Sequence, residues 1–237
     1  MKTRSLRSSV QEVVLIVLGI AIAFSLDAMW DGVVERREER RMLSSLRSEM
    51  SVNLDRLRAS VDVREAARAS ADALLQMTGP AAGPQNLTGI DSLMRSMRTA
   101  LATYDPRTGS TDALVLGGQL SLVSNDSLRL ALASWPELLR DLQEDERWAI
   151  EQNLAYFAPY PIEGGLLGSR GAAWMPIADS AGSVELLRDP RFARLVENQG
   201  RLMDQALRAS AGLDDGIQTI LRLVDSVLGE QPVEERR

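Results

Sequence analysis

The feature that most constrains this chain is an apolar segment near its N-terminus. Residues 13–26 contain no charged side chain and lie between Glu12 and Asp27. A helix that crosses a bilayer needs about 17 to 25 mostly apolar residues. The segment reaches that length when it is counted over residues 10–30, and Trp30 then stands at its edge, as interfacial anchors do.

Three interpretations of this segment compete: a membrane helix, a cleaved signal peptide and a buried core helix. A signal peptidase pattern is present at Ala21-Ile22-Ala23. However, cleavage after Ala23 would divide an apolar run that continues to Leu26. We therefore expect an uncleaved transmembrane helix over residues 10–30.

The polar sequence that follows predicts one long helix leaving the bilayer. No Pro or Gly occurs between Gly32 and Gly79. Apolar residues recur there at steps of three and four, as in a helix that buries one face. This stripe consists of Leu43, Leu46, Met50, Leu54, Leu57 and Val61.

Pro/Gly-rich stretches divide the rest of the chain. Loops are expected at residues 78–89, 103–111 and 158–183. Asp91 is expected to cap a short helix that ends at Ala102.

A second helix is expected between the later loops, reaching about Phe157. Asn125 or Asp126 is expected to cap it. Because Ser134-Trp135-Pro136-Glu137 reads as a capping box with Pro in the first turn, a kink or restart is expected at Pro136.

The last predicted helix begins with Asp189 as its N-cap and Pro190 in its first turn, and it has the most regular period in the chain. Gly212 and Gly216 either allow close helix approach or break this helix. Its seam is expected to face another helix, and a homo-oligomer along this seam is one hypothesis. The seam consists of Gln199, Met203, Ala206, Ser210, Leu213, Ile217, Ile220, Val224 and Val227.

The expected fold class is all-α: an N-terminal transmembrane helix continuing into a long helix, with an antiparallel bundle of about four helices. An aromatic content of 4% disfavours a β-sandwich or barrel. The expected regions are a cytoplasmic N-tail (1–9), the transmembrane helix (10–30), an α-helical soluble domain (31–229) and a disordered tail (230–237).

The composition excludes several classes of function. With no Cys and no His, the chain lacks thiols, imidazole bases and the usual zinc ligands. A net charge of -6 argues against nucleic-acid binding. We expect no catalytic activity, and no catalytic, cofactor-binding or metal-binding residue is assigned.

Acidic clusters are the remaining catalytic material: Asp214 with Asp215, and Glu144 with Asp145 and Glu146. Adjacent carboxylates on a helix point about 100° apart, so neither cluster forms a dyad by itself. Asp27 at the bilayer edge either contacts a partner or lies among the headgroups and ends the apolar span.

Two further segments have both a functional and a plain interpretation. In ERREERR, residues 35–41, the arginines lie on one side of the helix and the glutamates on the other. That arginine side either touches anionic headgroups or is simply solvated. The glycine-rich run Gly164–Gly171 is more typical of a surface loop than of a phosphate site, because it lacks the Lys-Ser/Thr ending.

Several short motifs resemble an uncharacterised bacterial family, known as a domain of unknown function. The apolar helix ends in Asp27-Ala28-Met29-Trp30, which is similar to the family's Asp/Asn-x-x-Trp ending. A second segment, from Thr111 to Leu132, resembles T-x-x-x-L-x-x-x-G-x-L-x-L-[IV]-x-[ND]-x-x-L-R-x-x-L, and LRDPRF at residues 187–192 resembles the start of the family's last helix. The family's usual aromatic pair is replaced here by Trp135-Pro136. The resemblance implies a membrane anchor and a helical domain, and it implies no catalytic residue.

The expected function is a membrane-anchored interaction or structural module, with a homo-oligomer or an envelope protein as partner. The alternative is an extracytoplasmic small-molecule-sensing domain that signals through a partner, with Trp174 and the glycine-rich run lining its pocket. The expected location is the bacterial inner membrane. Basic residues at Lys2, Arg4 and Arg7 favour a periplasmic soluble domain, whereas the arginines after the span favour the opposite side.

Overall fold

The computed structural model describes residues 3–83, 89–99, 103–152 and 180–229, and every regular element among them is helical. The elements are α1 (Thr3–Met77), α2 (Ile90–Thr99), α3 (Gly109–Val115), the 3-10 helix η2 (Gln119–Leu122), α4 (Asp126–Gln152), α5 (Ser180–Arg188) and α6 (Pro190–Gly229). The all-α prediction is confirmed.

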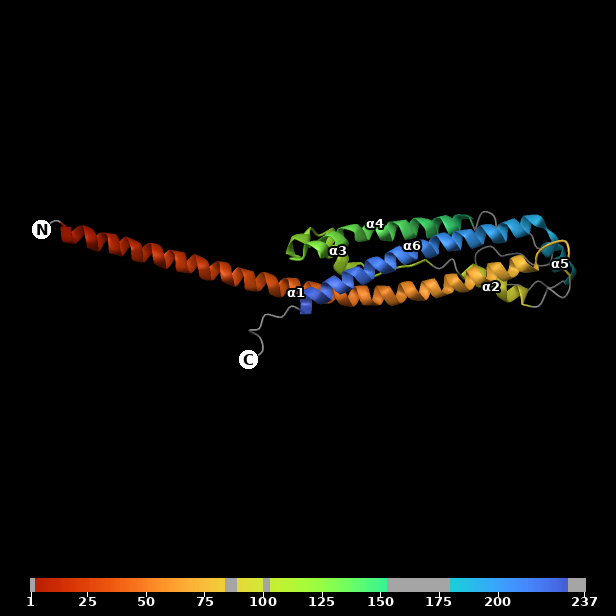
Figure 1. Ribbon diagram of the computed structural model, residues 1–237, viewed down its shortest axis with the longest axis horizontal. Coiled ribbons are helices and arrows are strands. Elements are labelled where there is room, and N and C mark those ends of the chain that lie inside the picture. Colours follow the sequence, from red (N-terminus) through yellow and green to blue (C-terminus); the bar gives the residue numbers. More distant parts are fainter. Residues whose placement is uncertain (1–2, 84–88, 100–102, 153–179, 230–237) are drawn as a thin grey trace.

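Three long helices form the body of the bundle. The second half of α1 packs along α6, and α6 packs along α4. The first part of α1 projects from one end of the bundle (Figure 1), and its apolar stretch is not buried by any part of the chain that the structure describes. We call the bundle end nearest this projection the proximal end, and the other the distal end.

The long helix predicted from the absence of Pro and Gly is confirmed, and it is continuous with the apolar segment. α1 runs from Thr3 through Gly32 to Met77, so it includes most of the expected N-tail. It ends where Thr78 turns back to bond the Leu75 carbonyl. Gly79 follows at φ +130°, a conformation that favours glycine.

The predicted caps hold at two helices and fail at one. The Asn125 side chain accepts the Leu128 N–H at 2.9 Å, and the Asp189 side chain accepts the Arg191 N–H at 2.8 Å. In contrast, α2 begins at Ile90, with Leu93 bonded to the Gly89 carbonyl, so Asp91 lies inside the first turn. Ala102 lies outside the described residues.

No restart occurs at Pro136. α4 is a single helix from Asp126 to Gln152, with Pro136 inside it. Ser134 does not cap a new helix, because its hydroxyl donates to the Ala131 carbonyl behind it. Burial of Trp135 at the same point supplies packing that holds the helix through the proline.

The C-terminal seam faces the chain's own helices. All of its residues except Val227 are buried, and its apolar residues from Leu213 to Val224 share a core with α1 and α4. α6 also passes Gly212 and Gly216 without a break. The helices that the seam was predicted to face are thus α1 and α4 of the same chain.

Two apolar clusters make up the core. The proximal cluster joins α1 residues such as Leu43 and Leu57 to Trp135 of α4 and Ile217 of α6. The distal cluster consists of Ala67, Ala71 and Leu74 of α1 together with residues of α2, α5 and the start of α6. Between these two clusters, α1 buries Arg64 and α6 buries Ser210, and these polar residues belong to the site described next.

Candidate functional site

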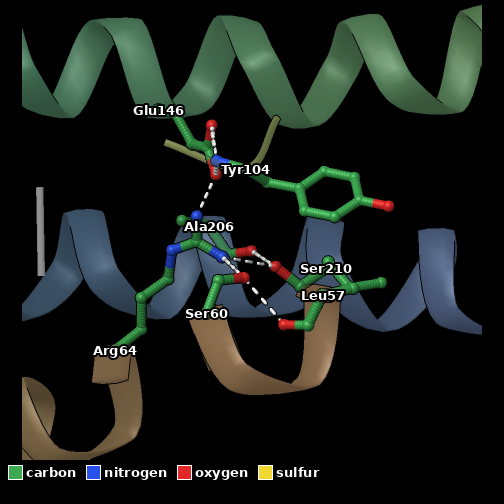
Figure 2. A network of polar contacts seen from close by, with 7 residues as sticks. All are labelled: Leu57, Ser60, Arg64, Tyr104, Glu146, Ala206 and Ser210. Carbon is green, nitrogen blue, oxygen red and sulfur yellow. Dashed lines mark hydrogen bonds and ion pairs between the residues drawn. The ribbon is translucent and has the colours of Figure 1, made fainter. Parts of the chain in front are cut away.

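A buried polar layer separates the proximal and distal apolar clusters. Its centre is Arg64 of α1, which is 2% exposed, and its carboxylate is Glu146 of α4, which is 5% exposed. Charged side chains are seldom buried to this degree unless they are paired. Figure 2 shows that α1, α4 and α6 all contribute to the layer.

Arg64 has a partner on each neighbouring helix. Its Nη2 bonds Glu146 Oε1, and its Nη1 donates to Ser60 Oγ and to Ser210 Oγ, each at 3.1 Å. Each hydroxyl in turn donates to a helix carbonyl, Ser60 to Leu57 and Ser210 to Ala206. Each serine hydroxyl thus donates its proton to a carbonyl of its own helix and accepts a hydrogen bond from the guanidinium.

Glu146 also holds the segment that precedes α3. The Tyr104 N–H lies 3.1 Å and 3.0 Å from the two Glu146 oxygens (Figure 2). The Tyr104 hydroxyl donates to the Asn53 carbonyl at 3.1 Å. Burial raises the pKa of the Tyr104 phenol well above its ordinary value, and burial lowers the pKa of Arg64.

One face of α1 continues this pattern toward the proximal end. The Asn53 amide brackets the backbone of Arg107, donating to its carbonyl at 2.7 Å and accepting its N–H at 2.8 Å. Glu49 accepts the N–H groups of Ser110 and Thr111, at the start of α3. Glu39 accepts both the N–H and the hydroxyl of Ser124.

These contacts explain how a segment with little regular structure lies along a helix. Residues 103–125 run antiparallel to α1, toward the proximal end. Side chains of α1 accept hydrogen bonds from the backbone N–H groups of this segment that have no partner within the segment. The expected loop over residues 103–111 is accordingly shorter than predicted, because Gly109 already begins α3. The arrangement can fix the register of the bundle, because each of these carboxylates accepts hydrogen bonds from backbone N–H groups of the same chain.

The acidic clusters singled out in the sequence do not converge. Asp214 pairs with Arg58 of α1 and with Gln218, whereas Glu146 faces Arg64. Asp145 accepts from Gln205. Glu144 and Asp215 are exposed. The two clusters therefore meet different partners, and Glu146 is the member that the sequence interpretation undervalued.

Arg64 and Asn53 were missed as site residues, although the sequence carried a signal. Arg64 follows Leu57 by seven residues and so extends the apolar stripe with a charged side chain. Both residues lie at stripe positions, and both are buried. A polar residue at a predicted core position is the feature that would have revealed the layer.

The apolar segment of α1 lies outside the bundle, and its large side chains are exposed. α1 contains a stretch long and apolar enough to cross a membrane, and none of that stretch is buried within the bundle. Phe24 is 70% exposed and Trp30 is 67% exposed. Asp27 is exposed at its end, as either interpretation of that residue requires.

One glutamate of the ERREERR segment is buried. Glu39 accepts the Ser124 N–H and thus faces the bundle. Arg36, Arg37 and Arg41 are exposed. The glycine-rich run Gly164–Gly171 and Trp174, on which the sensing alternative depends, lie outside the described residues, as do residues 230–237.

No protein-family model matches the chain, and comparisons with curated proteins and with solved structures find no match. The family resemblance of the sequence motifs therefore stays a prediction.

Proposed function

We propose that this protein is a single-pass, membrane-anchored helical interaction module without catalytic activity. Residues 10–30 cross the bacterial inner membrane, residues 1–9 stay in the cytoplasm, and the helical domain stands on the periplasmic side. The module presents a stiff bundle at a set distance from the bilayer, where it contacts a second copy or an envelope protein.

The observation that carries this proposal is the continuity of α1. The helix that contains the exposed apolar segment also contributes Leu43, Met50 and Leu57 to the bundle core. At 1.5 Å per residue, α1 extends about 70 Å beyond Trp30. A flexible linker would leave the domain free to turn, whereas a continuous packed helix couples its position to the membrane.

A contact role is supported by what three carboxylates of the bundle bind. Glu39, Glu49 and Glu146 bind backbone N–H groups of the same chain. Such bonds fix a shape, and a fixed shape is what an interaction module needs. The outer face of α4 offers two apolar side chains to a partner, Leu130 and Trp148, which are 74% and 50% exposed and lie five turns apart on one face.

Anchoring is tested by membrane extraction. The full chain should resist alkaline carbonate and float with membranes, while a chain that starts at Asp31 should be released. A single cysteine at exposed Ser51, the sole thiol of the chain, should react with an impermeant maleimide in intact cells. Labelling only after lysis would contradict the periplasmic side, and carbonate release of the full chain would contradict the anchor.

The contact role is tested by site-specific photo-crosslinking in cells. A photoreactive residue at Leu130 or Trp148 should give a discrete crosslinked product that identifies a second copy or an envelope protein. The control position is Arg140, which is exposed on α4 between them and lies about 80° around the helix from both. Failure at Leu130 and Trp148, or equal products at all three positions, would contradict a partner surface on α4.

A further inference from the structure

The part of α1 between the apolar span and the bundle has two chemically different faces. At about 100° per residue, the side chains from residue 27 to residue 41 fall into two separate arcs. One arc carries Met29, Trp30, Val33 and Val34, followed by Arg36, Arg37, Arg40 and Arg41. The other arc carries Asp27, Asp31, Glu35, Glu38 and Glu39. We call the first arc the arginine face and the second the acidic face.

The bundle fixes which way these faces point. Glu39 is buried against Ser124, and it lies on the same side of α1 as the core residues Leu43 and Leu46. The acidic face is thus turned toward the side on which the bundle packs. The arginine face is turned away from the bundle, and its members Arg36, Arg37 and Arg41 are exposed, with Arg40 half-buried.

The arginine face is suited to the surface of a bilayer. Its apolar residues continue the span directly, with Val33 and Val34 41% and 46% exposed. Its arginines begin about 9 Å beyond Trp30 and end about 16 Å beyond it. Long arginine side chains can lay their stems on apolar surface and direct the guanidinium to phosphate.

The same face stays open farther along the helix. Ser44, Ser48 and Ser51 follow the arginines at the same helical angle, and all three are exposed and small. These three side chains are therefore too short to hold this face away from a surface, and Arg47, which lies on the same arc, is paired with Asp225. The bundle lies on the opposite side, so a lean of α1 toward the arginine face lifts the bundle away from the membrane.

We propose that the arginine face binds the anionic phospholipid headgroups of the leaflet from which α1 emerges, so that α1 leans toward that face and the bundle is held above the surface. This inference rests on the proposed anchoring. The occupant is argued from charge complementarity and from continuity with the apolar span. The acidic face would be repelled by the same headgroups, which gives the lean a direction.

The test measures which side of α1 approaches the headgroups. The full chain, which has no cysteine of its own, is reconstituted in phosphatidylcholine vesicles with and without phosphatidylglycerol. A nitroxide is placed at Ser44→Cys on the arginine face or at Ser45→Cys, which is exposed and about 100° away. A lipid whose headgroup chelates Ni²⁺ reports, through spin relaxation, how often each label meets the headgroup layer.

The proposal expects stronger relaxation at Ser44 than at Ser45 when phosphatidylglycerol is present. That excess should be lost in pure phosphatidylcholine, which carries no net charge. It should also be lost in about 0.5 M salt, well above physiological ionic strength, because salt screens the attraction between arginines and headgroups. It should also be lost in the variant R36Q/R37Q/R41Q. It should persist in the charge-matched control R140Q/R147Q/R201Q, whose arginines are exposed on α4 and α6.

Equal relaxation at the two positions, or an excess indifferent to phosphatidylglycerol and to R36Q/R37Q/R41Q, would overturn the proposal. A Ser44 label that is immobilised but shielded from Ni²⁺ would show that a protein covers this face, and would also overturn it. Vesicle flotation separates these outcomes from a failed anchor. A chain that floats without face selectivity keeps its anchor, whereas a chain that does not float loses both.

Discussion

The two halves of α1 belong to one helix, yet they treat apolar side chains in opposite ways. Between Leu15 and Trp30 the large apolar side chains are exposed, whereas those at Leu43, Met50 and Leu57 are fully buried. The first half is apolar around its whole circumference, and the second is apolar along one stripe. One backbone thus carries two different patterns, and only the first is long and apolar enough to cross a membrane.

Polar groups mark the same division. Residues 13–26 carry no charge, while the bundle half of α1 buries Asn53 and Arg64. In the bundle these groups are satisfied by neighbouring helices and by the descending segment 103–125. Changes of charge should therefore harm the two halves for different reasons. An added charge in the first half opposes membrane insertion, whereas a removed charge in the second half leaves a buried partner unpaired.

The largest expected effect comes from charging the span. L18R/I22R should remove most carbonate-resistant membrane association, because an arginine near the centre of a spanning helix costs about 2.5 to 3.5 kcal/mol. Bundle folding, followed by circular dichroism, should persist, since neither residue contacts the bundle.

The matched control for the charged span is L116R/L130R. These residues are 77% and 74% exposed, but they lie on the bundle outside the span. Membrane association should be unchanged in this control. Equal loss of association in both double variants would contradict the assignment of two different surroundings.

The second effect tests the buried pair. Glu146→Leu should destabilise the bundle by about 3 to 5 kcal/mol, because it leaves the Arg64 guanidinium buried without its carboxylate. Denaturant unfolding of the full chain in detergent measures this change. R64M/E146L should lose less than Glu146→Leu alone, although the Tyr104 N–H then lacks its acceptor.

Glu144→Leu is the control for the pair, because Glu144 is exposed two residues away. Its cost should stay within about 0.5 kcal/mol, as for most surface substitutions. If Glu146→Leu and Glu144→Leu cost the same, the polar layer does not hold the bundle together.

Sequence alone foretold α1, α2, α4 and α6 and two of the caps, because these follow from local rules, whereas α5 begins at Ser180, within the loop expected over residues 158–183. The stripe from Leu43 to Leu57 and the Asn125 and Asp189 caps depend on residues a few positions apart. Arg64 and Glu146 could not be paired in the same way, since they are 82 residues apart and meet only after α4 packs. The seam on α6 was recognised, but its period does not say whether the facing helix belongs to another chain.

Pro136 also shows that local sequence rules do not decide the structure alone. Local rules favoured a new helix there, and burial of Trp135, Leu132 and Leu142 on one face of α4 outweighed them. Tertiary packing decided between two locally acceptable conformations.

A third effect concerns alkaline pH. The Tyr104 pKa is higher in the folded chain than in the unfolded chain, because of burial. Stability from this group is therefore fully present below the ordinary phenol pKa, about 10, and is lost as pH rises above it. Tyr104→Phe should cost about 1 kcal/mol at pH 7, through the lost bond to the Asn53 carbonyl, and should flatten the fall of Tm above pH 10. An unchanged slope of Tm against pH would contradict this assignment.

The smallest effect is a gain at a glycine of α6. Gly212→Ala should stabilise the bundle by about 0.8 to 1 kcal/mol, since a Cβ there meets nothing within 4 Å. Gly216→Ala should gain less, because its Cβ would lie 2.8 Å from Leu138 Cδ1. Thermal unfolding of the two variants side by side measures the difference, and a larger gain at Gly216 would contradict the close approach of α4 and α6.

The central claim is that one unbroken helix joins the bilayer to the bundle. Nitroxides at Ser25→Cys and Ser51→Cys, read by pulsed dipolar spectroscopy in lipid nanodiscs, test it directly, because both positions are exposed and the chain has no other thiol. A continuous helix predicts a narrow distribution centred near about 39 Å, from 1.5 Å per residue. A broad distribution, or a clearly shorter distance, would place a hinge between span and bundle and contradict the account.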